Sequence, residues 1–598
     1  MIIFLQQPFD LKKLQTLKNS HIITFDYESH KILSKCNIEH TQSEEFLNED
    51  DFVSIEKTCN KWTEWFNQEN IKQEITVNGI NLGSLFRWEF HFYLIPIIKK
   101  IFEIKKISEQ VNEFECSCSA FLENIAKRFF KYTELFDDLK NNDTLLFDSI
   151  KWNLTNNLEI SVKKENFEKV KKISEKVLVN FSKLNQKKDH NKKSILFIEF
   201  DPVKYENLFS KISNSNINPI FFNKRRPYFW DIRSFRIINQ TGGEIILDKE
   251  IHNVHAEREA IYQKILAVDE YYFEKHFSLN KNSFWNIIKD EFLKILEKKI
   301  GEGIKLIKDG NELFKNKNID EIIVWSENGF SEQVIIELGK KNKIPINLIQ
   351  HGIIVDKNDN RNNIFNKLSG IIPTNSNKYL VWNKSTQNYM ISLGFSVENI
   401  IQVGNPNFDI ISENKKYLES NYVLLTTTGP RKSQHAGYNS KLLDNYEYEL
   451  STICKKIKEQ KKKLVVRPHP FSQEFKIDDV VEESYPDAII DRKTEINSLI
   501  KNSEVVITYG VSTIFFEAQV LKKPVFFISA KHDMFGIPEY IKKNPESIIR
   551  FNEIEYCISR IYEDKKFKNS IINTNSTIMS DEFFNLGQST TNFLKIYE

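Results

Sequence analysis

The sequence predicts an α/β protein with two doubly wound parallel sheets. Short apolar runs alternate with segments of helical periodicity from about residue 194 to the end of the chain, which is typical of parallel sheets covered by helices. Polar or glycine-containing groups follow several of these runs, as expected where parallel strands end beside a ligand site. The 598 residues also exceed the size of one ordinary domain.

The first third of the chain, residues 1–185, differs from the rest. Two apolar runs at 2–5 and 21–25 indicate strands, and longer segments such as 85–104 have the pattern of helices. The first residues include neither a basic region nor a small-residue cleavage site, so we expect a strand there rather than a signal peptide. We therefore predict a helical N-terminal elaboration, followed by a linker or exposed loop at 183–193.

The rest of the chain alternates strands and helices. Up to residue 370 we expect helices at 283–308 and 331–341, and strands at 194–200, 218–222, 321–325 and 346–350. After residue 370 the apolar runs predict strands at 378–382, 399–403, 422–425, 463–466, 488–490, 504–508 and 524–528. We predict a Rossmann-like N-terminal domain at 1–370, with a helical insertion around 50–185, and a Rossmann-like C-terminal domain at 371–598.

Composition excludes several classes of function. Hydrophobic residues make up 40% and charged residues 28% of the chain, a balance that is typical of globular proteins. The formal net charge is only +2, which gives no electrostatic case for binding nucleic acid. The most apolar stretch, 90–102, is too short to span a bilayer, and one C-x-C pair among six cysteines does not predict a metal site. We expect a cytoplasmic protein.

The strongest site motif lies at 504–524, EVVITYGVSTIFFEAQVLKKP. A buried strand leads into Gly510, and Ser512 is predicted to cap the helix that follows. Free backbone N–H groups and the helix dipole favour a phosphate at such a point. Ser512 and Thr513 would add hydroxyl donors, and Glu517 would accept hydrogen bonds from a ribose. The alternative is an ordinary turn with a capping serine and a surface glutamate.

Two further turns point to the same nucleotide. After the run KLVV, Arg467 and the pair His469 and Pro470 form a stiff loop, whose histidine would donate a hydrogen bond to a phosphate. Arg467 would do the same or pair with a carboxylate inside the fold. After the run YVLL, Thr428 and Gly429 supply a hydroxyl and a flexible backbone for a diphosphate, with a mobile surface loop as the alternative.

The N-terminal domain contributes candidate catalytic groups. His351 follows the run INLIQ, and the glycine after it allows close backbone approach. Glu327 follows EIIVW and is a candidate base or nucleophile. A structural core histidine and a capping or ion-pairing glutamate are the alternatives. Asp201 alone is weak evidence for a functional site. We interpret the pair Arg225 and Arg226 as a surface feature rather than a site for an acidic acceptor or a membrane.

Four stretches between about residues 320 and 530 carry a resemblance: LIQHGI, KYLVWNKSTQNYMISLGFSVENIIQVGNPNFD, VVRPHP and VVITYGVSTIFFEAQVLKKPVFF. They resemble a cluster of bacterial glycosyltransferases with the GT-B architecture, in which two Rossmann-like domains face a cleft. This cluster includes the capsule and lipopolysaccharide Kdo transferases, the bacterial polysialyltransferases and the CDP-glycerol glycerophosphotransferases of teichoic acid synthesis.

The resemblance implies a role for each motif. His469 would contact the nucleotide phosphate of the donor, Ser512 and Thr513 would hold the same phosphate, and Glu517 would hold the ribose. His351 would lie across the cleft, near the reacting carbon or the acceptor. Such enzymes generally need no tightly bound metal, because protein donors stabilise the departing nucleotide.

Two departures from the resembling families bear on the donor. The teichoic acid enzymes have an Asp-Tyr-Ser-Ser type turn where this chain has YGVST at 509–513, and they have a tryptophan where this chain has Gln350. These departures count against glycerol phosphate and favour a cytidine-activated acidic sugar as the donor.

We therefore expect a metal-independent glycosyltransferase that moves a nucleotide-activated sugar, CMP-linked and acidic, onto a bacterial surface polysaccharide or lipopolysaccharide. The expected partners are this donor and a glycan or glycolipid acceptor, with peripheral association at the inner face of the cytoplasmic membrane and no other cofactor. Two alternatives remain open. One is an enzyme similar to UDP-N-acetylglucosamine 2-epimerase, and the other is an inactive glycosyltransferase-like scaffold in polysaccharide assembly.

Overall fold

The computed structural model describes residues 2–16, 20–111, 115–137, 139, 149–155, 158–180, 191–247, 253–411, 421–430, 440–469, 476–530 and 536–598. It divides into two compact units. Unit 1 consists of Met1–Leu146, Asn253–Lys305 and Ser433–Asp444, and unit 2 consists of Phe147–His252, Leu306–Lys432 and Asn445–Glu598. Among the described residues, no helix combines the length and the apolar character that crossing a membrane requires.

Unit 2 contains a seven-stranded parallel sheet in the order β12-β11-β10-β15-β16-β17-β18. The strands are β10 (Lys193–Ile198), β11 (Ile217–Phe222), β12 (Glu244–Ile245), β15 (Glu321–Val324), β16 (Ile346–Ile349), β17 (Lys378–Val381) and β18 (Ile400–Gln402). The strand order reverses between β10 and β15. The predicted boundary at residue 370 falls inside this sheet, because β17 and β18 continue it by pairing beyond β16.

Helices cover both faces of this first sheet. The helices α9 (Glu206–Ile212), α10 (Ile232–Thr241) and α25 (Ser589–Lys595) share one apolar core with its strands. Helix α14 (Phe330–Lys341) packs against β15 and β16. The runs of buried residues in β10 and β16 are typical of strands that are covered on both faces. The C-terminal helix α25 thus packs on the seven-stranded sheet, whose strands come much earlier in the chain.

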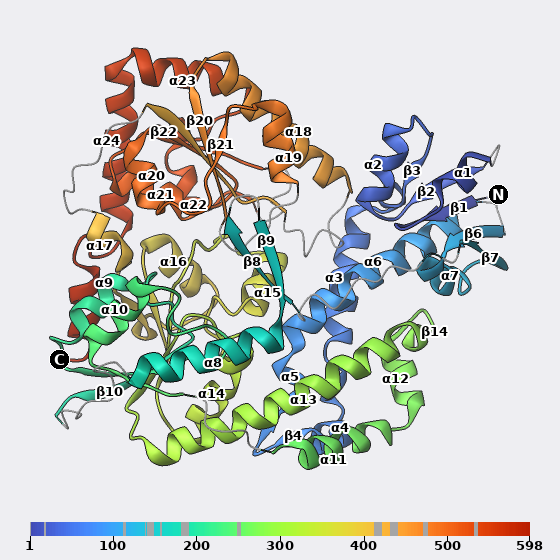
Figure 1. Cartoon of the computed structure of the whole chain (residues 1–598), viewed down its shortest axis with the longest axis horizontal. Helices are drawn as coiled ribbons and strands as arrows, with labels where there is room; N and C mark the ends of the chain where they lie inside the picture. Colours follow the sequence, from blue (N-terminus) through green and yellow to red (C-terminus); the bar gives the residue numbers. More distant parts are fainter. Residues whose placement is uncertain are drawn as a thin grey trace. The chain divides into compact units, whose positions relative to one another are not determined.

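A second parallel sheet of unit 2 has five strands in the order β21-β20-β19-β22-β23 (Figure 1). They are β19 (Tyr422–Thr427), β20 (Lys463–Pro468), β21 (Ile489–Ile490), β22 (Ser503–Tyr509) and β23 (Val525–Ile528). One face packs on α18 (Ser440–Glu459), α19 (Ile477–Ser484) and α23 (Ile554–Glu563). The other packs on α20 (Ile496–Asn502), α21 (Ile514–Val520), α22 (Glu539–Lys542) and α24 (Lys565–Glu582). The predicted α/β class with doubly wound parallel sheets is confirmed.

Unit 1 holds a third parallel sheet, in the order β3-β2-β1-β6-β7, where two strands and a helical elaboration were expected. Its strands are β1 (Ile2–Leu5), β2 (His21–Thr24), β3 (Thr41–Gln42), β6 (Glu115–Ser119) and β7 (Tyr132–Asp137). The expected strands β1 and β2 are present, but β6 (ECSCS) lacks the branched and aromatic residues that indicate a strand. The long helices of the unit are α3 (Glu49–Trp62), α6 (Arg87–Gln110) and α13 (Trp285–Asn316), which continues into unit 2.

Candidate functional site

Thr428 and Gly510 meet where the strand order of the second sheet reverses. Thr428 follows β19 and Gly510 follows β22, so both lie at the carboxyl edge, where open sheets bind ligands. The amide N and Oγ1 of Thr428 both donate to the carbonyl of Tyr509, at 3.1 and 3.2 Å. Gly510 has φ +84°, and a Cβ there would lie 2.2 Å from Thr428 Oγ1. The structure therefore brings together these two residues of the predicted nucleotide site.

Gly429 is packed against an aromatic support from helix α18. A Cβ at Gly429 would lie 2.5 Å from the ring of Tyr446. Tyr446 stacks on Tyr509 with ring centroids 6.1 Å apart, and the Tyr509 hydroxyl donates to Glu449 Oε2 at 2.7 Å. Because this support is buried, the 428–429 turn is a packed feature rather than a mobile surface loop.

Helix α21 begins one residue later than the sequence predicts. Its N-cap is Thr513 rather than Ser512, although Ser512 Oγ still accepts a hydrogen bond from Ile514 N at 3.3 Å. The Thr513 side chain lies near the carboxylate of Glu517. Burial raises the pKa of Glu517, while Thr513 and the ammonium of Lys204 act to lower it. Three of the predicted site residues thus lie together on the first turn of α21.

Arg467, near the end of β20, has a partner inside the fold. Its Nη1 donates to the carbonyl of Asp491 at 2.9 Å and lies 3.6 Å from Asp491 Oδ1. This contact matches the alternative that the sequence left open, since the guanidinium joins β20 to the turn after β21, and binding of the nucleotide by Arg467 stays a prediction. His469 follows β20 and is partly exposed, and Pro470 lies outside the described residues.

His351 lies beside the point at which the strand order of the first sheet reverses. Its ring meets the ring of Trp325, which follows β15, edge to face with centroids 4.7 Å apart. Lys204, from the turn after β10, donates to the His351 carbonyl at 3.2 Å. The preceding Gln350 is buried, and its Oε1 accepts a hydrogen bond from Trp382 N at 2.8 Å. These contacts fix the position of His351.

Two cations surround this histidine. The guanidinium of Arg226 lies 4.2 Å from the centre of the Trp325 ring, the same ring that His351 contacts. Burial lowers the pKa of His351 to about 3, and the charges of Lys204 and Arg226 act in the same direction. The imidazole is therefore uncharged at neutral pH beside two positive groups, an arrangement that favours an anionic ligand.

Lys204 lies within electrostatic range of groups on both sheets of unit 2. Although its side chain is partly open to solvent, desolvation by the surrounding protein and the neighbouring Arg226 lower its pKa to about 8, against the opposing carboxylates of Asp201 and Glu517. Asp201 follows β10 in the first sheet, whereas Glu517 lies on α21 beside the second sheet. Since Lys204 and Glu517 each shift the pKa of the other, the two switch points share one electrostatic environment.

A buried carboxylate, Glu199, holds the loop that carries Arg226. It accepts hydrogen bonds from the backbone N of Lys224, Arg225 and Arg226, at 2.8, 2.9 and 2.9 Å, and from Ser331 Oγ at 2.7 Å. Its own backbone has φ +55°, an uncommon conformation for a residue with a side chain. The Arg225 guanidinium and these hydrogen bonds hold the pKa of Glu199 below its usual value, against the effect of burial.

A second buried carboxylate completes this network. Arg225 Nη2 lies 3.1 Å from Oε1 of Glu332, on α14. The missing side chain at Gly329 leaves space for Glu332, because a Cβ at this position would lie 1.9 Å from Oε2 of Glu332. The exposed Arg225 thus pairs with a buried carboxylate, and the guanidinium of its neighbour Arg226 lies over the Trp325 ring. Sequence reasoning missed Arg226 and Lys204 as site residues; the double arginine after a strand was the only available signal.

Glu327, the predicted base or nucleophile, has hydrogen-bond partners inside the fold. Its Oε2 accepts from the backbone N of Thr374 and Asn375, at 2.8 and 2.9 Å, and from Thr374 Oγ1 at 2.5 Å. Its Oε1 accepts from Ser376 N at 2.8 Å. Both oxygens of this buried carboxylate are thus engaged by the 374–376 turn, which favours the structural alternative for Glu327, and its assignment to catalysis stays a prediction. Within the described residues, no group of three or more His, Cys, Asp or Glu is arranged to hold a metal ion.

Comparison with known proteins gives one family and a group of distant structures. Residues 250–536, slightly less than half of the chain, match the model of the family described as CDP-Glycerol:Poly(glycerophosphate) glycerophosphotransferase. This match supports a glycosyltransferase-like transferase domain within the chain. No curated protein matches the sequence.

Among the similar solved structures is the S. aureus MnaA–UDP co-structure, with 12% identity, a TM-score of 0.41, and coverage of 67% of this chain and 94% of that one. The UDP-GlcNAc 2-epimerase from Neisseria meningitidis bound to UDP-GlcNAc has 10% identity and a TM-score of 0.41, covering 67% and 99%. A glycosyltransferase from Rickettsia africae has 11% identity and a TM-score of 0.40, covering 68% and 98%. Likeness at this level carries no argument about function.

Proposed function

We propose that the chain is a glycosyltransferase-like enzyme that moves an acidic group from a cytidine-activated donor onto a bacterial surface polysaccharide or lipopolysaccharide. The observation that carries the proposal is the uncharged His351 between Lys204 and Arg226, electrostatically linked to Glu517 of the second sheet. Two cations beside an uncharged imidazole suit an anionic group. The match to a family whose description names CDP-glycerol supports cytidine as the nucleotide.

The donor nucleotide would lie at the carboxyl edge of the second sheet. Thr428, Gly429 and Gly510 form a tight turn there, and Ser512 and Thr513 present hydroxyls beside it. Backbone N–H groups and hydroxyls suit a phosphate, and His469 would donate to the same phosphate. Glu517 would accept hydrogen bonds from the ribose. Protein donors at this position would stabilise the nucleotide as it leaves, without requiring a metal ion.

His351 would act on the acceptor hydroxyl. The negative charge of the donor would offset the positive charges of Lys204 and Arg226. Its binding would therefore raise the pKa of His351 toward the range of a general base. The acceptor oxygen then forms a bond to the donor carbon or phosphorus, its proton passes to the imidazole, and the bond to the nucleotide phosphate breaks to release CMP. An acidic sugar on CMP and glycerol phosphate on CMP share this chemistry.

A nucleotide panel tests the proposed donor site. We expect CMP or CDP to stabilise the protein by about 2.7 kcal/mol at a hundred times Kd, and we expect His469→Ala to remove most of this stabilisation. Thermal unfolding with CMP, CDP, UMP and UDP measures it. A response to UDP alone would favour the epimerase alternative, and no response to any nucleotide would favour the scaffold. Equal stabilisation of His469→Ala would exclude this histidine from the site.

Donor identity is decided by a transfer assay. CMP release in the presence of acceptor polysaccharide is measured with a CMP-linked acidic sugar and, separately, with CDP-glycerol. We expect release with the acidic sugar, which the YGVST turn and Gln350 favour over glycerol phosphate. Release with CDP-glycerol only would show that these two departures do not determine the donor.

The charge of Lys204 predicts a pH dependence. Because its pKa is about 8 in the free protein, the ammonium is present below pH 8 and is lost above it. We expect the KM for the anionic donor to rise as the pH increases from 7 to 9. In Lys204→Arg the side chain stays charged throughout this range, so the rise should disappear. A wild-type KM that is constant over this range would rule out an ammonium–anion contact by Lys204.

A further inference from the structure

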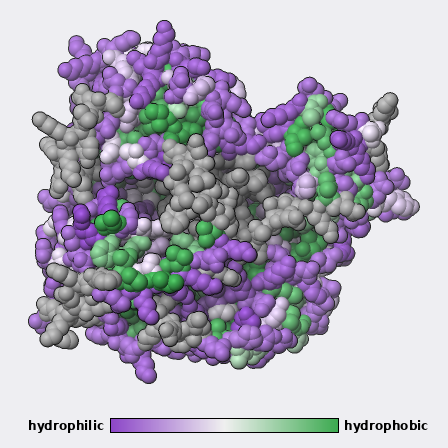
Figure 2. Space-filling view, viewed as in Figure 1, coloured by the Kyte–Doolittle hydropathy of each residue, from purple (hydrophilic) through white to green (hydrophobic). Residues whose placement is uncertain are grey.

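Helix α8 (Lys164–Asn180) of unit 2 exposes apolar side chains along one face. Val170, Ile173 and Val177 are 66%, 67% and 48% exposed. Their spacing of three and four residues places them side by side on the helix. Figure 2 shows apolar surface in the part of the view where Figure 1 draws α8.

The opposite face of α8 is buried, which fixes the exposed apolar residues outward. Lys171 Nζ donates to the carbonyls of Asn223 and Lys224 at 3.2 and 2.5 Å. Glu175, one turn later, accepts a hydrogen bond from Tyr228 N at 2.8 Å. Val179, one turn further, is buried in the apolar core of the first sheet. The helix thus has apolar side chains on its exposed face as well as on the face toward the core.

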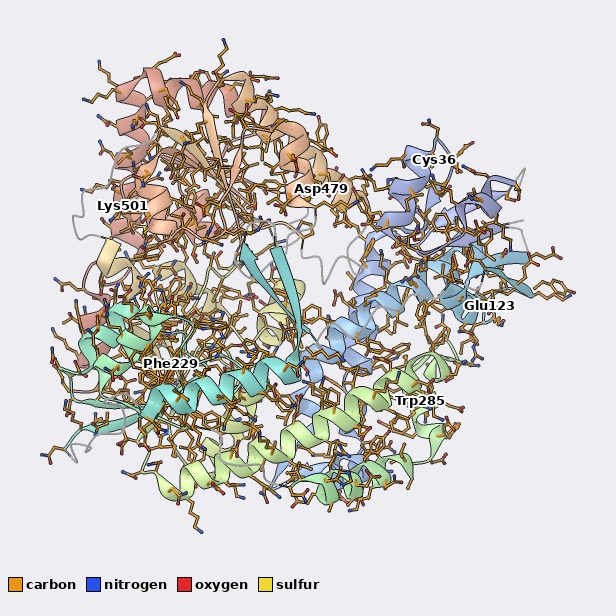
Figure 3. All side chains as sticks on the ribbon, viewed as in Figure 1. Cys36, Glu123, Phe229, Trp285, Asp479 and Lys501 are labelled. Carbon is orange, nitrogen blue, oxygen red and sulfur yellow. The ribbon has the colours of Figure 1, made fainter. Side chains whose placement is uncertain are left out.

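The segment bound by Glu175 also has exposed apolar side chains. Trp230 and Ile232 follow Tyr228 closely in sequence and are 48% and 79% exposed, and Phe229, which lies in this segment, is labelled in Figure 3. We call Val170, Ile173 and Val177 together the α8 surface.

Positive charges accompany the α8 surface. Lys163 lies immediately before α8, and Lys169 and Lys176 lie on it with exposed side chains. Of the two acidic residues of this helix whose side chains the structure describes, Glu175 is buried and Glu168 lies 4.0 Å from Lys164. The exposed charge of the helix is therefore mainly positive.

We propose that the α8 surface binds an anionic lipid bilayer, with its apolar side chains at the acyl boundary and its lysines at the headgroups. An outward apolar stripe beside lysines has the character of a helix that lies in a membrane interface, and the lysines complement anionic lipid. This site is separate from the transfer reaction, because none of its residues belongs to the two switch points. It would hold the enzyme at the surface on which glycolipid acceptors are found.

Vesicle flotation of the full chain tests this surface. The probes are vesicles of equimolar phosphatidylglycerol and phosphatidylcholine, and vesicles of phosphatidylcholine alone. We expect the wild type to float with the anionic vesicles, and the variant V170S/I173S/V177S to lose about tenfold or more in bound fraction. The matched control I391S/V397S/I489S changes three exposed apolar residues of unit 2 (41%, 58% and 44% exposed) and should bind like the wild type. Lys169→Gln with Lys176→Gln should weaken binding to the anionic vesicles only.

Each other outcome overturns the proposal. Absence of wild-type binding to either vesicle, or equal binding by all variants, would reject the α8 surface as a membrane site. Self-association of the wild type that the α8 variant abolishes, without vesicle binding, would instead identify the surface as an interface between copies. Thermal unfolding of every variant confirms that it remains folded, and nucleotide binding should be unchanged in all of them.

Discussion

Replacing Glu199 by glutamine is expected to lower kcat/KM for transfer by about 100-fold, while the affinity for CMP stays unchanged. Glutamine keeps the size of the side chain but loses the charge, so it cannot accept all three backbone hydrogen bonds from residues 224–226 with the same strength. The guanidinium of Arg226 then loses its fixed position over Trp325. Steady-state kinetics gives kcat/KM. Calorimetry independently measures the affinity for CMP at the second sheet.

A double-mutant cycle shows whether Glu199 acts through Arg226. Arg226→Gln alone should cause a similar loss, and the double variant should lose little more than either single variant, because both changes remove the same placed guanidinium. Glu337→Gln is the matched control, since Glu337 is an exposed glutamate on α14 that pairs with Lys340. Additive losses in the cycle would contradict a positioning role for Glu199. If CMP affinity fell in step with kcat/KM, the first sheet would be acting on the nucleotide rather than on the transferred group.

Gly510→Ala is expected to destabilise the protein by about 3 kcal/mol and to abolish binding of CMP. Its φ of +84° strains any residue with a Cβ, and this Cβ would lie 2.2 Å from Thr428 Oγ1. The two turns at the switch point would have to separate, and the proposed phosphate site would be lost with them. Guanidinium unfolding and the CMP thermal shift measure the two effects.

Gly394 provides the matched control for this glycine. It has φ +85°, but a Cβ at this position would meet no described atom within 4 Å, so Gly394→Ala carries only the backbone strain, about 1 kcal/mol. Adding Thr428→Ala to Gly510→Ala removes the clashing oxygen and should restore part of the stability, without restoring CMP binding. Equal destabilisation by the two glycine variants would show that contact with Thr428 is not the reason for a glycine at position 510.

The sequence predicted well which residues lie at the carboxyl ends of the strands of the second sheet. Thr428, Gly429, Gly510, Ser512 and Thr513 follow buried strands, and the register of a parallel sheet brings such residues to one edge. The helix cap was displaced by one residue, from Ser512 to Thr513, because side-chain patterns do not define helix starts within a residue or two.

The partners of charged residues were not predictable from the sequence. Glu327 and Arg467 have the right residue types at strand ends, but both are occupied by partners inside the fold. Arg226 and Lys204 looked like ordinary surface cations. Whether a charge is free to meet a ligand depends on partners that lie far away in the chain, and a single sequence does not identify those partners.

The sequence by itself determined the α/β class, most of the strands of unit 2 and the glycine-containing turns at their ends. Periodicity, turn residues and buried runs are local, so they can be recognised without knowing what packs against them. Only the tertiary structure decided that the N-terminal third forms a third parallel sheet, that Glu199 directs Arg226 to Trp325, and that α8 exposes apolar side chains. Each of these depends on contacts between residues distant in sequence, because burial and charge pairing arise only once the chain has folded.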